Sequence, residues 1–289
     1  MWLLGNSVAL ALGASFFFGL ALVLTQFGLR YARPSEGILI SIPLVTVIVW
    51  LAAPVVALEG FDLRAAAVFL AIGLVYPAAV TMLTYQANDL MGPAVAGALG
   101  NLAPLFAVLG GMLLFGERPA ALQILGILTI VLGIILLSLS RDGVTRSWPL
   151  WAILLPLAAS VIRGAVQPIG KVGLSIWPSS FAAVLLGYTA STFVVAIVAF
   201  VQHRHGRVNF APKGILWFAC IGLSNGLAVL ALYAALTHGS VVLVAPLAAT
   251  YPLVTLVLGA VLLRAEKITL PLFAGVLITV AGVALLLGR

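Results

Sequence analysis

A single arginine inside an apolar segment is the residue best placed to do chemistry in this chain. Arg163 lies about fourteen residues into the apolar stretch 149–171, near the middle of a segment long enough to cross a bilayer. A charge at that depth costs about 2.5–3.5 kcal/mol on insertion scales, so we expect it to face a cavity or a polar partner. Pro168 leaves a helix carbonyl without its usual donor beside this arginine. A helical wheel places these residues on one polar face: Ser160, Arg163, Gly164, Gln167 and Lys171. The face predicts a recess for a ligand with an anionic group; the alternative is that Arg163 satisfies helix carbonyls or snorkels.

Polar side chains in other apolar segments could line the same recess. Tyr76-Pro77 predicts a bend in one segment, and Gly226 falls at the equivalent place in another, so both helices are expected to open locally. A lone Ser, Thr or Asn in a membrane helix more often bonds to a neighbouring helix, and that alternative stays open for each. The predicted substrate-binding residues are Arg163, Gln167, Ser160, Tyr76, Thr84, Tyr85, Asn101, Asn225 and Tyr251.

Acidic residues and histidines are absent from the deep parts of these segments. A membrane-embedded acid would be the simplest way to bind a cationic drug and exchange it for protons, so that function is disfavoured. Glu117 and Glu266 lie at segment ends, where a helix N-terminus would stabilise a carboxylate; proton coupling is the alternative. The sequence shows no His/Asp/Glu cluster and no nucleophile-base spacing, so we predict no enzyme activity, no cofactor and no metal.

The elements that must position these residues are membrane helices. Of 289 residues, 64% are hydrophobic and 7% are charged, whereas a soluble domain carries roughly a quarter charged. Period-2 alternation is absent, which favours an all-helical bundle over a barrel. The net charge of +7 sits mostly in the polar gaps, so it indicates orientation in a bilayer and not nucleic-acid binding. The predicted spans are 3–27, 37–57, 66–88, 92–115, 120–140, 149–171, 179–201, 214–236, 240–263 and 269–288.

The chain contains an internal repeat. At a shift of 145 residues, Gly19 and Gly28 fall on Gly164 and Gly173. At shifts of 148 and 149, the matches are Tyr85, Pro104, Gly110, Glu117, Gly126 and Gly133 with Tyr233, Pro252, Gly259, Glu266, Gly275 and Gly282. We therefore predict two five-helix repeats, 1–144 and 145–289. An odd number of spans per repeat makes them inverted, which places a substrate site near the midplane where they meet.

The stretch 94–139, with Pro104, Gly116-Glu117 and two later glycines, resembles the EamA-type repeat of the drug/metabolite transporter superfamily, and 233–287 repeats it. The resemblance implies a ten-helix metabolite transporter, often an exporter. One departure is that relatives often have Trp-Gly and Trp-Ala where this chain has Phe18-Gly19 and Arg163-Gly164.

Together these patterns predict an exporter or exchanger of small anionic or zwitterionic metabolites, such as amino acids, working by alternating access. Its predicted partners are a small-molecule substrate and the lipid bilayer, with no nucleic acid, and it is predicted to be a monomer or homodimer in the bacterial cytoplasmic (inner) membrane. The alternatives are a flippase for a lipid-linked phosphate carrier, whose headgroup an arginine could hold, a multidrug efflux transporter, or a scaffold that transports nothing.

Lys and Arg residues are unevenly divided between the two sides of the membrane. Arg64, Arg118, Lys171 and Arg289 fall on the side of the termini, and Arg30, Arg33, Arg141, Arg146, Arg204, Arg207, Lys213, Arg264 and Lys267 on the other. The positive-inside rule therefore predicts termini outside the cytoplasm, whereas the resemblance implies termini inside.

Overall fold

The described part of the protein is entirely helical. The computed structural model describes residues 2–31, 34–56, 58–91, 96, 99–139, 149–202, 212–263 and 270–288. An apolar chain in lipid must satisfy its backbone polar groups internally, and a helix does so within one segment. The helices are α1 (Trp2–Gly28), α2 (Pro34–Ala52), α3 (Leu63–Val75), α4 (Ala78–Met91), α6 (Ala103–Phe115), α7 (Ala121–Leu139), the 3-10 turn η1 (Leu150–Ile153), α8 (Leu154–Ile176), α9 (Ser180–Gln202), α10 (Pro212–His238), α11 (Val241–Ala248), α12 (Tyr251–Leu263) and α13 (Leu270–Leu287).

These helices form ten membrane segments, five in each half of the chain, as predicted. Within the described residues, six stretches are long and apolar enough to cross a membrane alone, and α2, α6, α7 and α13 contain shorter apolar helices. The pairs α3–α4 and α11–α12 each make up one segment that is divided in two. Large apolar side chains such as Leu113, Phe193 and Phe200 are exposed on the outer surface, where lipid would cover them. The protein is an integral membrane protein.

Short polar signals set the helix ends at the predicted gaps. Asp62 begins α3, because its Oδ1 accepts hydrogen bonds from the backbone N–H groups of Arg64 at 2.8 Å and Ala65 at 3.1 Å. Gly116 ends α6 with a left-handed φ of 63°, which glycine adopts without steric cost. Ser240 begins α11 and accepts from the backbone N–H of Leu243 at 3.3 Å.

One of the two predicted helix openings is wrong. The segment around Pro77 does break, since α3 ends at Val75 and α4 begins at Ala78. At the equivalent position α10 runs through Gly226 without interruption. A Cβ at Gly226 would lie 2.9 Å from Cγ1 of Val45, so this glycine allows α10 to approach α2 closely.

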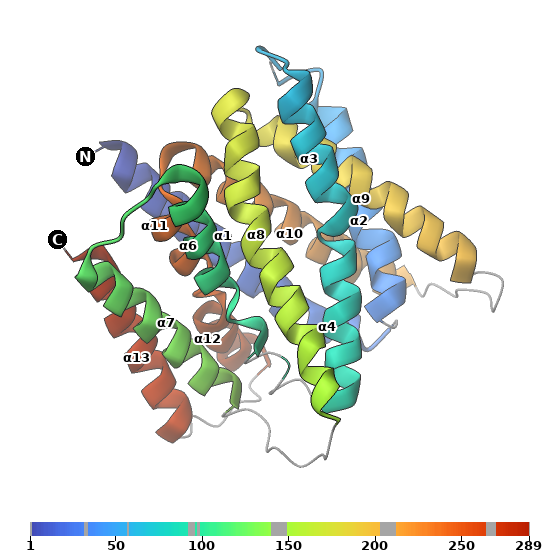
Figure 1. Cartoon of the computed structure of the whole chain (residues 1–289). Coiled ribbons are helices and arrows are strands. Elements are labelled where there is room, and N and C mark those ends of the chain that lie inside the picture. The colour runs from blue at the N-terminus through green and yellow to red at the C-terminus, as the bar shows by residue number, and fades with distance from the viewer. Residues whose placement is uncertain are drawn as a thin grey trace.

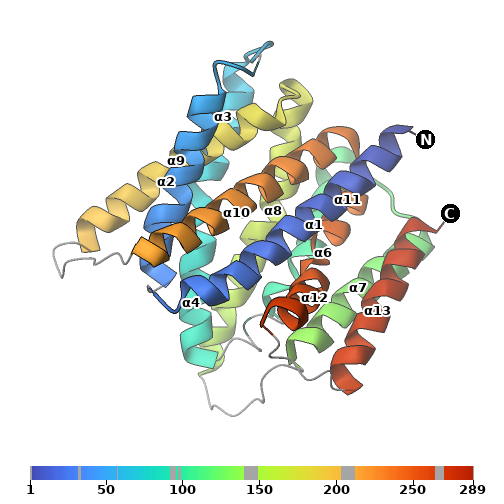
Figure 2. The same ribbon diagram turned by 180° about the vertical axis from the view of Figure 1, so that it is seen from behind.

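The same helix contacts occur in both halves. α1 packs on α10, and its counterpart α8 packs on α3 and α4; Figure 2 shows α1 and α10 side by side. A Cβ at Gly28 would lie 3.3 Å from the ring of Phe218, and a Cβ at the equivalent Gly173 would lie 2.5 Å from the equivalent ring, Phe69. The repeat seen in the sequence is therefore a repeat of packing.

A second pair of contacts is matched in the same way. A Cβ at Gly19 would lie 2.6 Å from Cβ of Val254, where α1 meets α12. A Cβ at Gly164 would lie 2.6 Å from Cβ of Phe106, where α8 meets α6. Both glycines let a helix of one repeat approach the backbone of the other repeat.

The pairing of α7 with α13 shows that the repeats are inverted. A Cβ at Gly126, early in α7, would lie 2.8 Å from the carbonyl oxygen of Gly282, late in α13. A Cβ at Gly133, late in α7, would lie 3.0 Å from the carbonyl oxygen of Gly275, early in α13. The two equivalent helices therefore run antiparallel, at the edge of the bundle in Figure 1. The predicted boundary between 144 and 145 lies outside the described residues and stays a prediction.

Candidate functional site

Helix α8 brings the charged residue of the predicted site into the bundle. It is the most strongly amphipathic of the described helices, and Arg163 is half-buried on it. Within the described part of the chain Arg163 makes no hydrogen bond and no ion pair. Its charge acts electrostatically on Tyr76, which follows the last residue of α3. A guanidinium among membrane helices is thus left with its donors available.

Gln167 lies one turn further along α8. Its Oε1 is buried and has no hydrogen-bond partner among the described residues. A buried acceptor left without a donor costs about 1–3 kcal/mol, so a native structure normally supplies one from water or a ligand. Arg163 and Gln167 together offer donors and an acceptor on one face of the helix.

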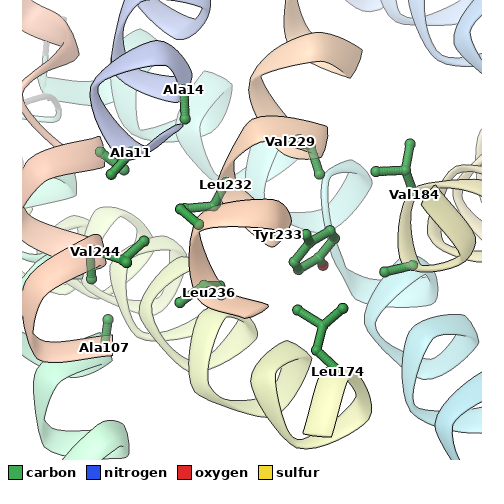
Figure 3. Close-up of a cluster of buried hydrophobic side chains, with 14 of the residues drawn as sticks. Ala11, Ala14, Ala107, Leu174, Val184, Val229, Leu232, Tyr233, Leu236 and Val244 are labelled. Carbon is green, nitrogen blue, oxygen red and sulfur yellow. The ribbon is translucent and has the colours of Figure 1, made fainter. Parts of the chain in front are cut away.

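Three tyrosines surround a small pocket next to this face. Tyr76, Tyr188 and Tyr233 come from the end of α3, from α9 and from α10, and all three line the pocket. Figure 3 shows Tyr233 between Val184 and Leu174 in the apolar core. Within the described residues none of the three hydroxyls has a hydrogen-bond partner. The lining residues are Ile72, Tyr76, Pro77, Ala183, Val184, Gly187, Tyr188, Val229 and Tyr233.

Helix α9 contributes residues that sequence reasoning missed. A Cβ at Gly187 would meet only the carbonyl oxygen of Phe69, at 3.8 Å, so this glycine leaves space at the pocket wall. Tyr188 follows it directly. The signal was present, because residues 187–192 read Gly-Tyr-Thr-Ala-Ser-Thr, a polar run within an otherwise apolar span.

Two predicted residues contact one another across the two repeats. The hydroxyl of Tyr251, at the start of α12, donates to Oδ1 of Asn101 at 3.1 Å. The ring of Phe18 meets Tyr251 edge to face at 6.2 Å between centroids. Phe18 is the repeat counterpart of Arg163, so the equivalent positions hold an aromatic contact in one half and an unpaired charge in the other.

The remaining predicted residues lie in different surroundings. The Ser160 hydroxyl is fully buried within hydrogen-bond distance of the carbonyls of Leu99, at 2.7 Å, and Pro156, at 2.9 Å. Thr84 donates to the carbonyl of Val80 within α4, at 2.7 Å. Asn225 is half-buried on α10, and the side chain of Tyr85 lies outside the described residues. The structure thus places Arg163 and Gln167 one turn apart on α8 and Tyr76 within electrostatic range of Arg163, while Ser160 and Thr84 bond to backbone.

The arrangement has a definite chemical character. A cation, an unsatisfied amide oxygen and phenol hydroxyls suit a ligand that carries an anion and a hydrogen-bond donor. Among the described residues no group of three or more His, Cys, Asp or Glu could hold a metal ion. The site offers binding groups from both repeats.

Comparisons with known proteins agree with this architecture. The model of the EamA-like transporter family matches residues 5–139 and again residues 150–288. No curated protein matches the chain. A solved structure described only as "Crystal structure of protein" is similar with a TM-score of 0.79 at 17% identity, over 97% of this chain and 96% of that one. At that identity the likeness shows the fold alone.

Proposed function

Since the chain belongs to the EamA-like transporter family, we propose that it carries small anionic or zwitterionic metabolites, such as amino acids, across the membrane. It is a membrane transporter and not an enzyme, and its substrate is a small molecule. The proposal concerns the chemistry of that molecule and the residues that bind it.

The single observation that carries the proposal is the unpaired guanidinium of Arg163 beside the unpaired Oε1 of Gln167. A guanidinium binds a carboxylate through two parallel N–H···O bonds, and an amide oxygen accepts from an ammonium group. An amino-acid backbone presents both groups a short distance apart. Tyr76 lies within electrostatic range of Arg163, and its hydroxyl can donate a further hydrogen bond to the carboxylate.

Alternating access follows from the inverted repeats, whose halves can tilt against one another around a site near the midplane. The sequence has no Asp, Glu or His deep in a span, so we propose facilitated export or exchange without obligatory proton coupling. Asn101 and Tyr251, one from each repeat, are proposed to border the site on the side of α12.

The test is solute uptake into proteoliposomes. Labelled amino acids and related carboxylates should accumulate by counterflow, whereas a cationic dye of similar size should not. The same vesicles can contain a fluorescent phospholipid and a lipid-linked phosphate. Scrambling of either lipid without solute counterflow would favour a flippase and contradict the proposal.

The proposed setting is the bacterial inner membrane, with the protein as a monomer or homodimer. The charge bias favours termini outside the cytoplasm, although most Lys and Arg residues on the more basic side lie outside the described residues. A reporter active only in the cytoplasm, fused after Arg289, tests this: strong activity would place the termini inside.

A further inference from the structure

An ion pair joins three helices from both repeats at one end of the bundle. Nζ of Lys171, on α8, lies 2.8 Å from Oε1 of Glu117, just beyond the end of α6. The ammonium also donates to the carbonyl of Gly239 at 2.8 Å. The side chains of Lys171 and Glu117 are only 20% and 12% exposed, so salt screens this pair less than a surface pair.

The same carboxylate caps a helix of the other repeat. Its two oxygens accept the backbone N–H groups of Val241, at 2.9 Å, and Val242, at 2.8 Å, at the start of α11. A helix N-terminus was the predicted surrounding for Glu117, but the helix is α11 and not α7, which follows it in the chain. Glu117 therefore fastens α6 of one repeat to α11 of the other, and Lys171 adds α8 to the junction.

The junction lies between the candidate site and the side of the membrane that holds both termini. Lys171 is one turn of α8 beyond Gln167 and about 12 Å along the helix from Arg163. Near the N-terminus, Ser7 packs against Gly239, where an added Cβ would lie 2.8 Å from Cβ of Ser7. Near the C-terminus, Gly288 packs against the start of α7, where an added Cβ would lie 3.1 Å from the side chain of Leu122. Figure 1 shows the two termini near each other at this end. Opening the site toward the termini requires α6, α8 and α11 to separate here.

The repeat shows what would close the opposite side. If the two repeats exchange conformations, each contact on the side of the termini is lost, and the equivalent residues of the other repeat form the corresponding contact on the opposite side. Glu117 corresponds to Glu266, which lies outside the described residues, but Lys171 corresponds to Gln26, a neutral residue exposed on α1. An amide can hydrogen-bond a carboxylate but adds no charge attraction.

We propose that Glu117 and Lys171 form a one-sided gate that biases the resting transporter toward the conformation closed on the side of the termini. The charge at position 171 and its absence at position 26 set this bias, which in turn sets the side from which an empty transporter takes up substrate. The gate sets the relative positions of α6, α8 and α11 and contacts no substrate, so the proposal does not depend on which small molecule is carried.

The test is the accessibility of a cysteine that lies behind the gate. Cys220, the single cysteine, is replaced by Ala, and Gln167→Cys then reports reaction with a membrane-impermeant maleimide added from either side. A Gly288→Cys variant identifies the side of the termini. Lys171→Gln, which copies the repeat counterpart, should raise labelling from that side about three- to tenfold, and Lys171→Arg should leave it near the starting value.

A gain-of-charge variant separates gating from stability. By the repeat, Gln26→Lys supplies to the other conformation the charge that Lys171 supplies to this one, so it should also raise labelling from the side of the termini, in a protein that keeps its original ion pair. Unchanged labelling in both Lys171→Gln and Gln26→Lys would overturn the proposal. So would an equal rise from both sides with a lower melting temperature, because loosened packing opens both sides alike. None of these readouts uses a substrate, so failure of the proposed amino-acid specificity would not affect them.

Discussion

Helices α1 and α8 occupy equivalent places in the two repeats, and they agree where backbones meet but differ where chemistry is expected. Gly19 and Gly164 each let a helix of the other repeat approach to the same distance. One residue before each glycine, α1 has Phe18, packed on Tyr251, and α8 has Arg163, without a hydrogen bond or ion pair among the described residues. The glycines found in both repeats allow the helix packing of the inverted fold, whereas Arg163, which has no charged counterpart in the first repeat, makes the two halves chemically different.

The largest test of this comparison removes the unshared charge. Arg163→Ala should weaken substrate binding about 30- to 150-fold, because a hydrogen bond to a charged group contributes about 1.5–3 kcal/mol and a carboxylate can take two. Counterflow in proteoliposomes and ligand-induced thermal shifts in detergent measure the loss. Phe18→Ala is the matched control in the other repeat and should lower affinity no more than about threefold, since it removes one aromatic contact. Unchanged affinity in Arg163→Ala would remove the basis of the proposed substrate class.

The next test addresses the shared residues. Gly19→Ala and Gly164→Ala each place a Cβ 2.6 Å from another side chain, and overpacking of this kind costs about 1–3 kcal/mol. Both should lower the melting temperature in detergent by similar amounts. Gly13→Ala should not, because a Cβ there meets nothing within 4 Å. A large loss in one repeat only would show that the matched contacts are not energetically equivalent.

A smaller effect is expected at the tyrosine pocket. Tyr188→Phe removes one hydroxyl without changing the ring, so substrate affinity should fall about two- to tenfold, the range for one hydrogen bond. Tyr31→Phe, at an exposed tyrosine in the turn after α1, is the control. KM rising with unchanged maximal rate would assign the hydroxyl to substrate binding. A fall in stability with normal transport would make it a packing residue.

The smallest expected effect concerns energy coupling. Collapsing a proton gradient across the proteoliposome membrane should change exchange rates less than about twofold, because no acid lies deep in a span. Glu117→Gln should mainly lower expression and alter sidedness, since its carboxylate joins α6, α8 and α11. Uphill accumulation driven by protons and lost in Glu117→Gln would reverse this interpretation.

The sequence predicted the fold well because its signals are local. Apolar runs fix the spans, and glycines repeated at shifts of 145 and 149 residues mark where helices touch. The break at Pro77 was visible for the same reason, as proline removes a helix donor. Gly226 was misinterpreted because a glycine for flexibility and a glycine for close packing look alike in sequence, and only the contact with Val45 distinguishes them.

The site was less predictable because its members are joined by contacts across helices. Helix periodicity placed Arg163 and Gln167 on one face, but nothing in the sequence shows that the Ser160 hydroxyl reaches the carbonyl of Leu99. The partnership of Glu117 with Lys171 and α11 spans more than one repeat and was equally hidden. Tyr188 on α9 was not predicted, because an uncharged polar run costs far less to bury in a membrane span than a charge and is therefore a weaker signal of a site.

The antiparallel pair α7 and α13 has a consequence for ancestry. Gly126 with Gly282 and Gly275 with Gly133 are one contact seen twice, since each is carried onto the other by exchanging the repeats. Such an interface is self-complementary, like that of a twofold-symmetric dimer. A single five-helix chain inserted into the membrane in both orientations would make both contacts with one pair of glycines. Gene duplication and fusion would then require no new interface between the halves. The later change would be the loss of the arginine from one copy or its gain by the other.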